Sequence, residues 1–286
     1  MLAPVLSLLA ADLRSRGIAP RTVAAYTRII RPFVDQRSDL ESLNRLDVAE
    51  WIYSADTESK QRHRYLAMNA LCRALVDEGS LASNPCAQVK MPVEAESPQP
   101  SLTDEAFRRL LATCDARTLI GKRDRAIIET LGSTGCRVAE LAAMSVDDVD
   151  LDAAQILIRN PKKERSGKAR MRLIYLNDDA VKALASWMRV RAPRATASAL
   201  WTDARGRGVT SNGVQQMVAR RGERIGLRVS PHQFRRRLAS NWLLYGLSES
   251  GLMAMGGWKS PTMPSRYAAG SLAEIARADH QRLNCR

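Results

Sequence analysis

Apolar residues recur at helical spacing through the first third of the chain. In the stretch 57–77 the apolar stripe consists of Tyr65, Met68, Leu71, Cys72 and Leu75. Gly79 follows this stretch, and glycine commonly ends a helix. The same spacing predicts helices over 1–16, 20–34, 47–55 and 57–77. Residues 1–92 are therefore predicted to form an all-helical first domain.

A segment without periodicity separates this domain from the rest of the chain. Residues 91–100 contain three prolines, which favour an extended linker. We place the linker at 93–101 and the second domain at 102–286. Thr103, followed by Asp104, is a suitable cap for the first helix of the second domain.

The period changes from helical to alternating inside the second domain. Residues 155–159 and 171–176 predict two strands, and the basic segment 160–170 joins them as a long hairpin connection. Helical spacing resumes at Asn177 and continues nearly to the end, with an interruption at 193–208. The predicted fold class is therefore mainly α with a small β-hairpin or sheet (α+β).

Composition excludes several classes of protein. No run of apolar residues approaches the length of about 18 that a membrane span needs. The five cysteines are odd in number and scattered, which argues against a disulfide framework and for a reducing cytoplasm. The three histidines form no cluster with cysteines at metal-ligand spacing, so no metal site is predicted.

The chain is strongly basic, with a net charge of +14. Residues 1–92 hold 12 basic and 10 acidic residues, whereas residues 93–286 hold 32 and 20. The excess therefore falls in the second domain and its linker. Such an excess indicates a nucleic-acid partner, with ordinary solvated surface charge as the alternative.

One predicted helix start combines a histidine with an arginine. Ser230 is a good N-cap and Pro231 suits the first helical position, which places His232 and Arg235 on one face of the first turn. The N-terminus of a helix already favours a bound phosphate. This corner is therefore a candidate for stabilising an oxyanion.

A second arginine follows the turn expected at 134–135. Glu140 lies three residues after Arg137, where it can orient the guanidinium. Taken alone, such a pair is more often a solvated ion pair than part of a site.

Three further side chains suit phosphoryl transfer. Lys162 in the hairpin connection can donate a proton, Trp258 offers an indole N–H, and Tyr267 offers a phenolic nucleophile. Each of the three alone is more often structural, and only their combination points to chemistry.

Taken together, these residues resemble the motifs of the tyrosine recombinase (phage integrase) family, over essentially the whole chain. Residues 134–141 look like the family's first arginine box, and 232–235 look like its His-x-x-Arg box. Gly257-Trp258, followed nine residues later by Tyr267, looks like its final segment. The resemblance implies a helical core-binding domain and a catalytic domain that form a clamp around DNA.

The resemblance also implies the catalytic set. Its members are Arg137, Lys162, His232, Arg235, Trp258 and Tyr267. Tyr267 would attack the scissile phosphate and form a 3′-phosphotyrosyl intermediate, while the two arginines hold the non-bridging oxygens and the tryptophan supports the phosphate. His232 would assist removal of the tyrosine proton. Lys162, with Lys163 as the alternative, would protonate the departing 5′-oxygen.

Partners and location follow from the same resemblance. We expect a homotetramer on paired sites of double-stranded DNA, with no cofactor, metal or membrane, and an accessory directionality factor as a further partner. The expected location is the cytoplasm of a bacterium, at the nucleoid, with the protein encoded by the bacterium or a phage. The amphipathic tail 271–283 would dock on its own domain or on a neighbouring subunit.

Three positions depart from the family pattern. Arg236 stands where members often have a second histidine, and Trp258 replaces the commoner histidine. Pro264 lies three residues before Tyr267 and is expected to disturb a helix that carries the nucleophile.

Other functions remain open from the sequence. A tyrosine-type topoisomerase uses similar chemistry without exchanging strands, and a decayed recombinase would bind DNA without cutting it. An RNA-binding or metabolic phosphoryl-transfer protein is disfavoured because the chain has no glycine-rich phosphate loop.

The charge of the second domain predicts a steep salt dependence of DNA binding. If about six phosphates are contacted, affinity for duplex DNA falls by about 10³-fold between roughly 50 and 200 mM salt. Titrations of a labelled duplex at several salt concentrations measure this slope. A flat response would exclude nucleic acid as the partner.

Overall fold

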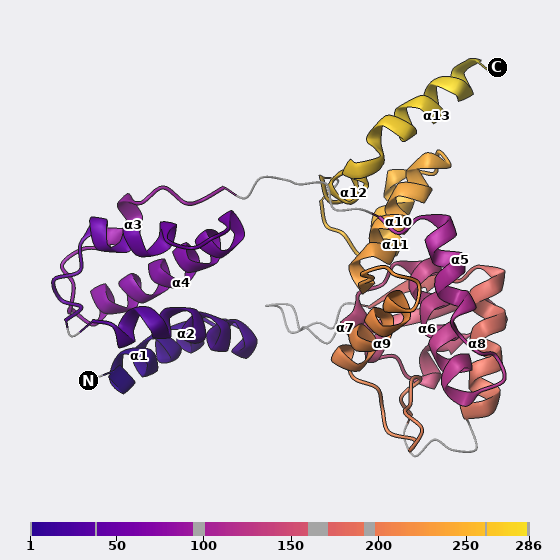
Figure 1. The fold of residues 1–286 in the computed structure, drawn as a ribbon, viewed down its shortest axis with the longest axis horizontal. Helices are drawn as coiled ribbons and strands as arrows, with labels where there is room; N and C mark the ends of the chain where they lie inside the picture. Colours follow the sequence, from indigo (N-terminus) through magenta and orange to yellow (C-terminus); the bar gives the residue numbers. More distant parts are fainter. Residues whose placement is uncertain are drawn as a thin grey trace. The chain divides into compact units, whose positions relative to one another are not determined.

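The computed structural model describes residues 2–37, 39–93, 101–159, 171–191, 198–260 and 262–284. The chain divides into two compact units, Met1–Ser97 and Pro98–Arg286 (Figure 1). Most of the predicted linker, residues 94–100, lies outside the described residues.

The described part of the first unit is all helical, as its apolar spacing predicts. Its elements are α1 (Leu2–Ser15), α2 (Pro20–Asp35), α3 (Arg45–Tyr53), α4 (Glu58–Asp77) and the 3₁₀ turn η1 (Pro85–Gln88). The Thr57 hydroxyl caps α4 by accepting a hydrogen bond from the backbone N–H of Lys60, and Gly79 follows the helix with a φ of +85°. Leu9, Ile30, Ile52 and Met68 from the four helices are fully buried together.

The second unit carries the remaining elements. They are α5 (Asp104–Ala112), α6 (Leu119–Thr134), α7 (Val138–Ala142), η2 (Val146–Asp148), β1 (Val149–Asp150), β2 (Gln155–Arg159), β3 (Met171–Tyr175), α8 (Asp178–Arg191), α9 (Ser211–Glu223), α10 (Pro231–Leu244), α11 (Glu249–Gly256), α12 (Thr262–Ala268), η4 (Ala269–Ser271) and α13 (Leu272–Asn284). The prediction of a mainly helical fold with a small sheet is confirmed.

The sheet is antiparallel and has the order β1-β2-β3. The two predicted strands pair from Gln155 with Tyr175 to Arg159 with Met171. Ile156, Ile158 and Ile174 turn into the core, as alternation requires. The sequence did not indicate β1, because a two-residue strand shows no alternation.

Helix α6 runs through the core of the second unit. It packs against α8 and α10, and its Ala126, Ile127, Ile128 and Leu131 are almost fully buried. Because α6 ends at Thr134, this packing fixes the position of the first residues of the segment 134–141, which contains Arg137.

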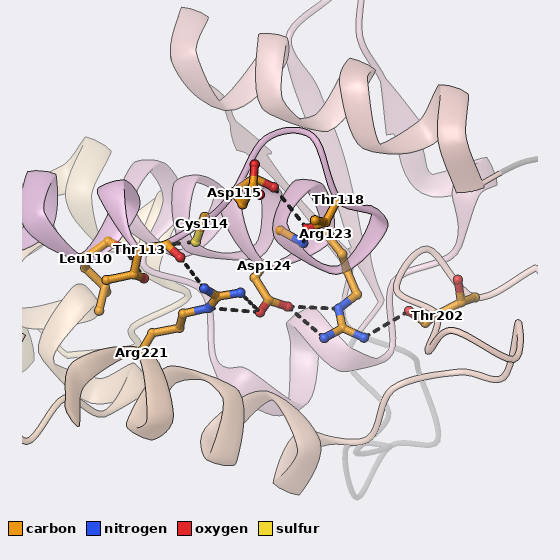
Figure 2. A network of polar contacts seen from close by, with 10 residues as sticks. Leu110, Thr113, Cys114, Asp115, Thr118, Arg123, Asp124, Thr202 and Arg221 are labelled. Carbon is orange, nitrogen blue, oxygen red and sulfur yellow. Dashed lines mark hydrogen bonds and ion pairs between the residues drawn. The ribbon is translucent and has the colours of Figure 1, made fainter. Parts of the chain in front are cut away.

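The start of α6 is held by a buried carboxylate (Figure 2). One oxygen of Asp124 lies 2.7 Å from Arg123 Nη2, and the other lies 2.7 Å from Arg221 Nη2 on α9. Arg123 also donates a hydrogen bond to the backbone carbonyl of Thr202, and Arg221 donates one to that of Thr113. This network joins α6 to the end of α5, to the loop at Thr202 and to α9.

Replacing Asp124 by Asn is expected to destabilise the second unit. The change leaves two buried guanidiniums beside a neutral amide, which costs about 3–5 kcal/mol of unfolding free energy. Urea unfolding of the full chain, followed by the fluorescence of its buried tryptophans, measures the loss. Asp115→Asn is the control, because Asp115 forms an exposed pair with Arg117 and its loss should change little. Equal effects of the two variants would contradict the role of Asp124.

Candidate active site

A buried arginine on α10 lies at the centre of the site. Arg235 is 2% exposed, and it donates hydrogen bonds to the carbonyl oxygens of Gly135 (2.9 Å) and Gly256 (2.6 Å). Burial, followed by the field of Arg137, lowers the pKa of Arg235 to about 10. The guanidinium therefore keeps its charge at neutral pH.

A side chain at Gly135 would be strained. Its φ of +55° is in the left-handed region, and a Cβ would lie 2.8 Å from Leu238 Cδ2 and 3.3 Å from Arg235 Cα. Glycine at this position therefore allows α10 to approach the end of α6 closely enough for the arginine to reach the carbonyl.

Two aromatic rings lie against this guanidinium. Arg235 Cζ is 4.1 Å from the ring centre of Trp258 and 5.4 Å from that of Tyr267. The two ring centres are 5.2 Å apart. Among the described residues the buried indole Nε1 of Trp258 has no hydrogen-bond partner, so one donor beside the tyrosine is available.

Tyr267 lies on the short helix α12, which forms despite Pro264. The expectation that this proline would disturb the helix is wrong, because Pro264 is the third residue of α12. The first four N–H groups of a helix have no partner within the helix, so a proline there removes no hydrogen bond. Pro264 is buried and Tyr267 is half-buried.

His232 lies in the first turn of α10 and faces the tyrosine. The helix starts at Pro231, and the Gln233 side chain accepts a hydrogen bond from the Ser230 backbone N–H (2.8 Å). The imidazole and the Tyr267 ring are 6.3 Å apart, with an angle of 22° between their planes. Burial and three nearby arginines lower the pKa of His232, which favours the neutral imidazole at neutral pH.

Arg137 precedes α7 and is tied to Glu140 of that helix. Arg137 donates from Nη1 to Glu140 Oε1 and from its backbone N–H to Oε2, both at 2.9 Å. Its side chain is 46% exposed, whereas that of Glu140 is 3% exposed. The pair therefore joins a half-exposed arginine to a buried carboxylate. It differs from the solvated ion pair that is usual at this spacing.

A second arginine holds the same carboxylate. Arg172 on β3 donates to both oxygens of Glu140, at 3.0 and 2.7 Å. The sequence placed this residue in the predicted strand 171–176 but gave no indication of its bond to Glu140. The alternation of the strand gave one indication that the side chain points inward. Arg172 lies two residues before the buried Ile174, so both side chains belong to the inward face of β3.

Arg137, Arg172 and Trp258 border a pocket of about 260 Å³. It is lined by Arg137, Met171, Arg172, Met253, Ala254, Gly257 and Trp258. Two guanidiniums, an indole and the left-handed turn after α11 therefore face one space.

The last member of the predicted set is the lysine of the hairpin connection. Lys162 and Lys163 fall within 160–170, outside the described residues. Where the structure does describe the chain, no three His, Cys, Asp or Glu side chains gather into a metal site. Nor does any helix in those ranges have the length and apolar character to cross a bilayer.

Glu140 should make stability depend on pH. Burial alone would raise the pKa of this carboxyl, but the bonds from Arg172 and Arg137 lower it from an ordinary 4.5 to about 2. Its contribution to folding is therefore full above about pH 4.5 and is lost as the pH falls toward 2. Glu140→Gln is expected to cost about 3 kcal/mol at neutral pH, and the cost should shrink in that acidic range.

The control for this experiment is a second buried glutamate. Burial raises the pKa of Glu129 on α6, so its ionisation opposes folding. The difference between wild type and Glu129→Gln should therefore change with pH in the opposite direction. Chemical unfolding at a series of pH values measures both, and a cost of Glu140→Gln that does not depend on pH would contradict the pairing.

Comparisons with known proteins find a similar sequence among the recombinases. The chain is 26% identical over 249 residues to the tyrosine recombinase XerD of Listeria monocytogenes serotype 4b (strain F2365), covering 81% of this chain and 82% of the relative.

Solved structures show the same fold. The Tn1549 transposon integrase in complex with a circular intermediate DNA is similar with a TM-score of 0.76 and 17% identity, covering 97% of this chain and 99% of that one. The lambda integrase tetramer bound to a Holliday junction gives a TM-score of 0.74 and 18% identity, covering 93% and 76%. The sequence model of the phage integrase family matches residues 100–273. The chain therefore belongs to the phage integrase family.

Proposed function

We propose that the protein is a site-specific DNA recombinase that cuts and rejoins duplex DNA through a tyrosine. The observation that supports this most strongly is the arrangement of Tyr267 between a neutral imidazole and a buried guanidinium. His232 stacks beside the phenol, and Arg235 lies against its ring. A nucleophile, a proton acceptor and a fixed positive charge thus occupy one site.

Cleavage begins when the phenol oxygen of Tyr267 attacks a backbone phosphorus. A tyrosine hydroxyl ordinarily keeps its proton at neutral pH, so His232 accepts that proton as the bond forms. The new bond joins the tyrosine to the 3′-phosphate, and the bond between phosphorus and the 5′-oxygen breaks.

Charge on the phosphate is stabilised by Arg137 and Arg235, which hold the non-bridging oxygens. The indole N–H of Trp258, for which the described part of the chain offers no partner, supplies one more hydrogen bond. The departing 5′-oxygen takes its proton from Lys162, with Lys163 as the alternative donor on the same hairpin.

Rejoining reverses these steps. A 5′-hydroxyl from a partner strand attacks the phosphotyrosine, and Tyr267 leaves and recovers its proton. The phosphotyrosyl ester conserves the phosphodiester bond, so the cycle requires no ATP.

We further propose that the protein acts as a homotetramer on paired sites. The solved lambda integrase tetramer on a Holliday junction supports this assembly. Helix α13 packs on α10 of its own unit, yet its Leu272 and Leu283 are exposed and offer an apolar face to a neighbouring subunit. The proposed role is DNA integration, excision or resolution in a bacterial cytoplasm, with a directionality factor as an added partner.

A covalent adduct with DNA tests the chemistry. The full-length protein is incubated with a pool of nicked duplexes that carry a randomised central segment, and adducts that survive denaturation are recovered and sequenced. We expect wild type to select a defined sequence. Tyr267→Phe should form at least about 10⁴-fold less adduct, since the nucleophile is absent.

Tyr175→Phe is the matched control, because this exposed tyrosine on β3 lies outside the proposed set. It should form adduct at the wild-type rate. An adduct that persists in Tyr267→Phe would remove Tyr267 from its role. Relaxation of supercoiled plasmid without sequence selection would indicate a topoisomerase.

A further inference from the structure

Arg172 joins three segments that border the proposed site. From β3 its guanidinium reaches both oxygens of Glu140 on α7, and its Nε donates to the carbonyl oxygen of Met255 on α11 (3.1 Å). The side chain is 17% exposed and lines the same pocket as Arg137 and Trp258. The guanidinium therefore connects β3 to both α7 and α11.

The turn before Trp258 is shaped around this guanidinium. Gly257 has a φ of +62°, and a Cβ there would lie 2.9 Å from Arg172 Cζ and 3.0 Å from its Nε. The close approach means that Arg172 supports the backbone from which the tryptophan projects. Arg172 thus contacts Glu140, which holds Arg137, and the backbone turn that precedes Trp258.

The charges of this cluster have a consequence for anion binding. Glu140 carries one negative charge and is shared by two arginines, so the three side chains together carry a net charge of +1. Without Arg172, Arg137 and Glu140 would form a neutral pair, and the buried carboxylate would attract Arg137 more strongly. Arg172 therefore satisfies Glu140 and leaves the charge of Arg137 available to a phosphate.

We propose that Arg172 is a positioning residue of the active site, which orients Arg137 and keeps its charge available for the scissile phosphate. The proposal rests on the function proposed above. It assigns to Arg172 an effect on the rate of cleavage, transmitted through Glu140, and no direct part in bond making or breaking.

The first experiment measures single-turnover adduct formation on the duplex recovered from the pool. Arg172→Met is expected to slow adduct formation at saturating DNA by about 10²-fold, as misplacement of a catalytic group does, while the Kd for DNA changes by less than about threefold. Arg172→Lys keeps the charge but loses the fork geometry of the guanidinium. Its rate of adduct formation should therefore lie between those of wild type and Arg172→Met.

A compensating change separates positioning from stability. Adding Glu140→Gln to Arg172→Met removes the unsatisfied carboxylate, so we expect the double variant to recover at least about tenfold of the lost rate. A residue that only stabilised the fold would give a double variant no faster than the single one. Arg159→Met is the matched control, because Arg159 on β2 also pairs with a buried carboxylate, Asp148, but does not line the pocket.

A second experiment needs no DNA. The protein has five tryptophans, so its indole N–H signals can be resolved in ¹H–¹⁵N spectra, with Trp258→Phe to assign the one in the site. Inorganic phosphate is titrated into each variant. We expect the phosphate concentration for half-saturation to rise at least about fivefold in Arg172→Met, to return toward wild type in the double variant, and to stay unchanged in Arg159→Met.

The two experiments fail in different ways. If wild type forms no adduct but the phosphate titrations follow the expected order, the proposed recombinase function is contradicted, whereas the role of Arg172 at the anion site is supported. If wild type forms adduct and Arg172→Met matches it in rate, the function stands and the proposal for Arg172 is overturned. A wild-type Trp258 signal that phosphate does not shift, or equal phosphate binding in wild type and Arg172→Met, also overturns the proposal.

Discussion

The site depends on one buried guanidinium that holds the ends of two helices. Helix α6 ends at Thr134 with Gly135 as its C-cap, α11 ends at Gly256, and the carbonyl oxygens of both glycines accept hydrogen bonds from Arg235. Helix C-termini leave carbonyls unsatisfied and carry partial negative charge, so a cation between two of them is stabilised from both sides. Two residues beyond each of these glycines lie Arg137 and Trp258. One buried charge therefore fixes the starting points of two site residues.

The same arrangement leaves that charge only partly compensated. No carboxylate among the described residues lies within ion-pair distance of Arg235, whose guanidinium also lies against the rings of Trp258 and Tyr267. Burying a cation without an anion is costly, and carbonyl dipoles and ring faces offset only part of the cost. A phosphate that enters the site supplies the missing negative charge, which is the condition for strong electrostatic stabilisation. At Arg137 the charge is balanced differently, by a carboxylate that Arg172 shares.

The helices and the hairpin strands could be predicted from the sequence because each leaves a local pattern, and similar local patterns named five of the candidate site residues. Apolar spacing identified α4, and Ser230-Pro231 identified the start of α10. Contacts between segments that are far apart in the sequence leave no such pattern. The bond from Arg235 to Gly256 and the bond from Arg172 to Glu140 are of this kind. The misjudgement of Pro264 had another cause, because its effect depends on its position within the turn, and the sequence alone did not locate the first residue of α12.

The most direct test of the proposed chemistry is to locate the covalent bond. Trypsin cuts after Arg266 and Arg277, so the fragment 267–277 carries Tyr267 as its only tyrosine. Mass spectrometry of the protein–DNA adduct after nuclease and trypsin digestion identifies the modified fragment and the end of the nucleotide that is attached. We expect a nucleotide linked through its 3′-phosphate to Tyr267. A nucleotide on any other residue, or one linked through its 5′-phosphate, would contradict the proposed mechanism.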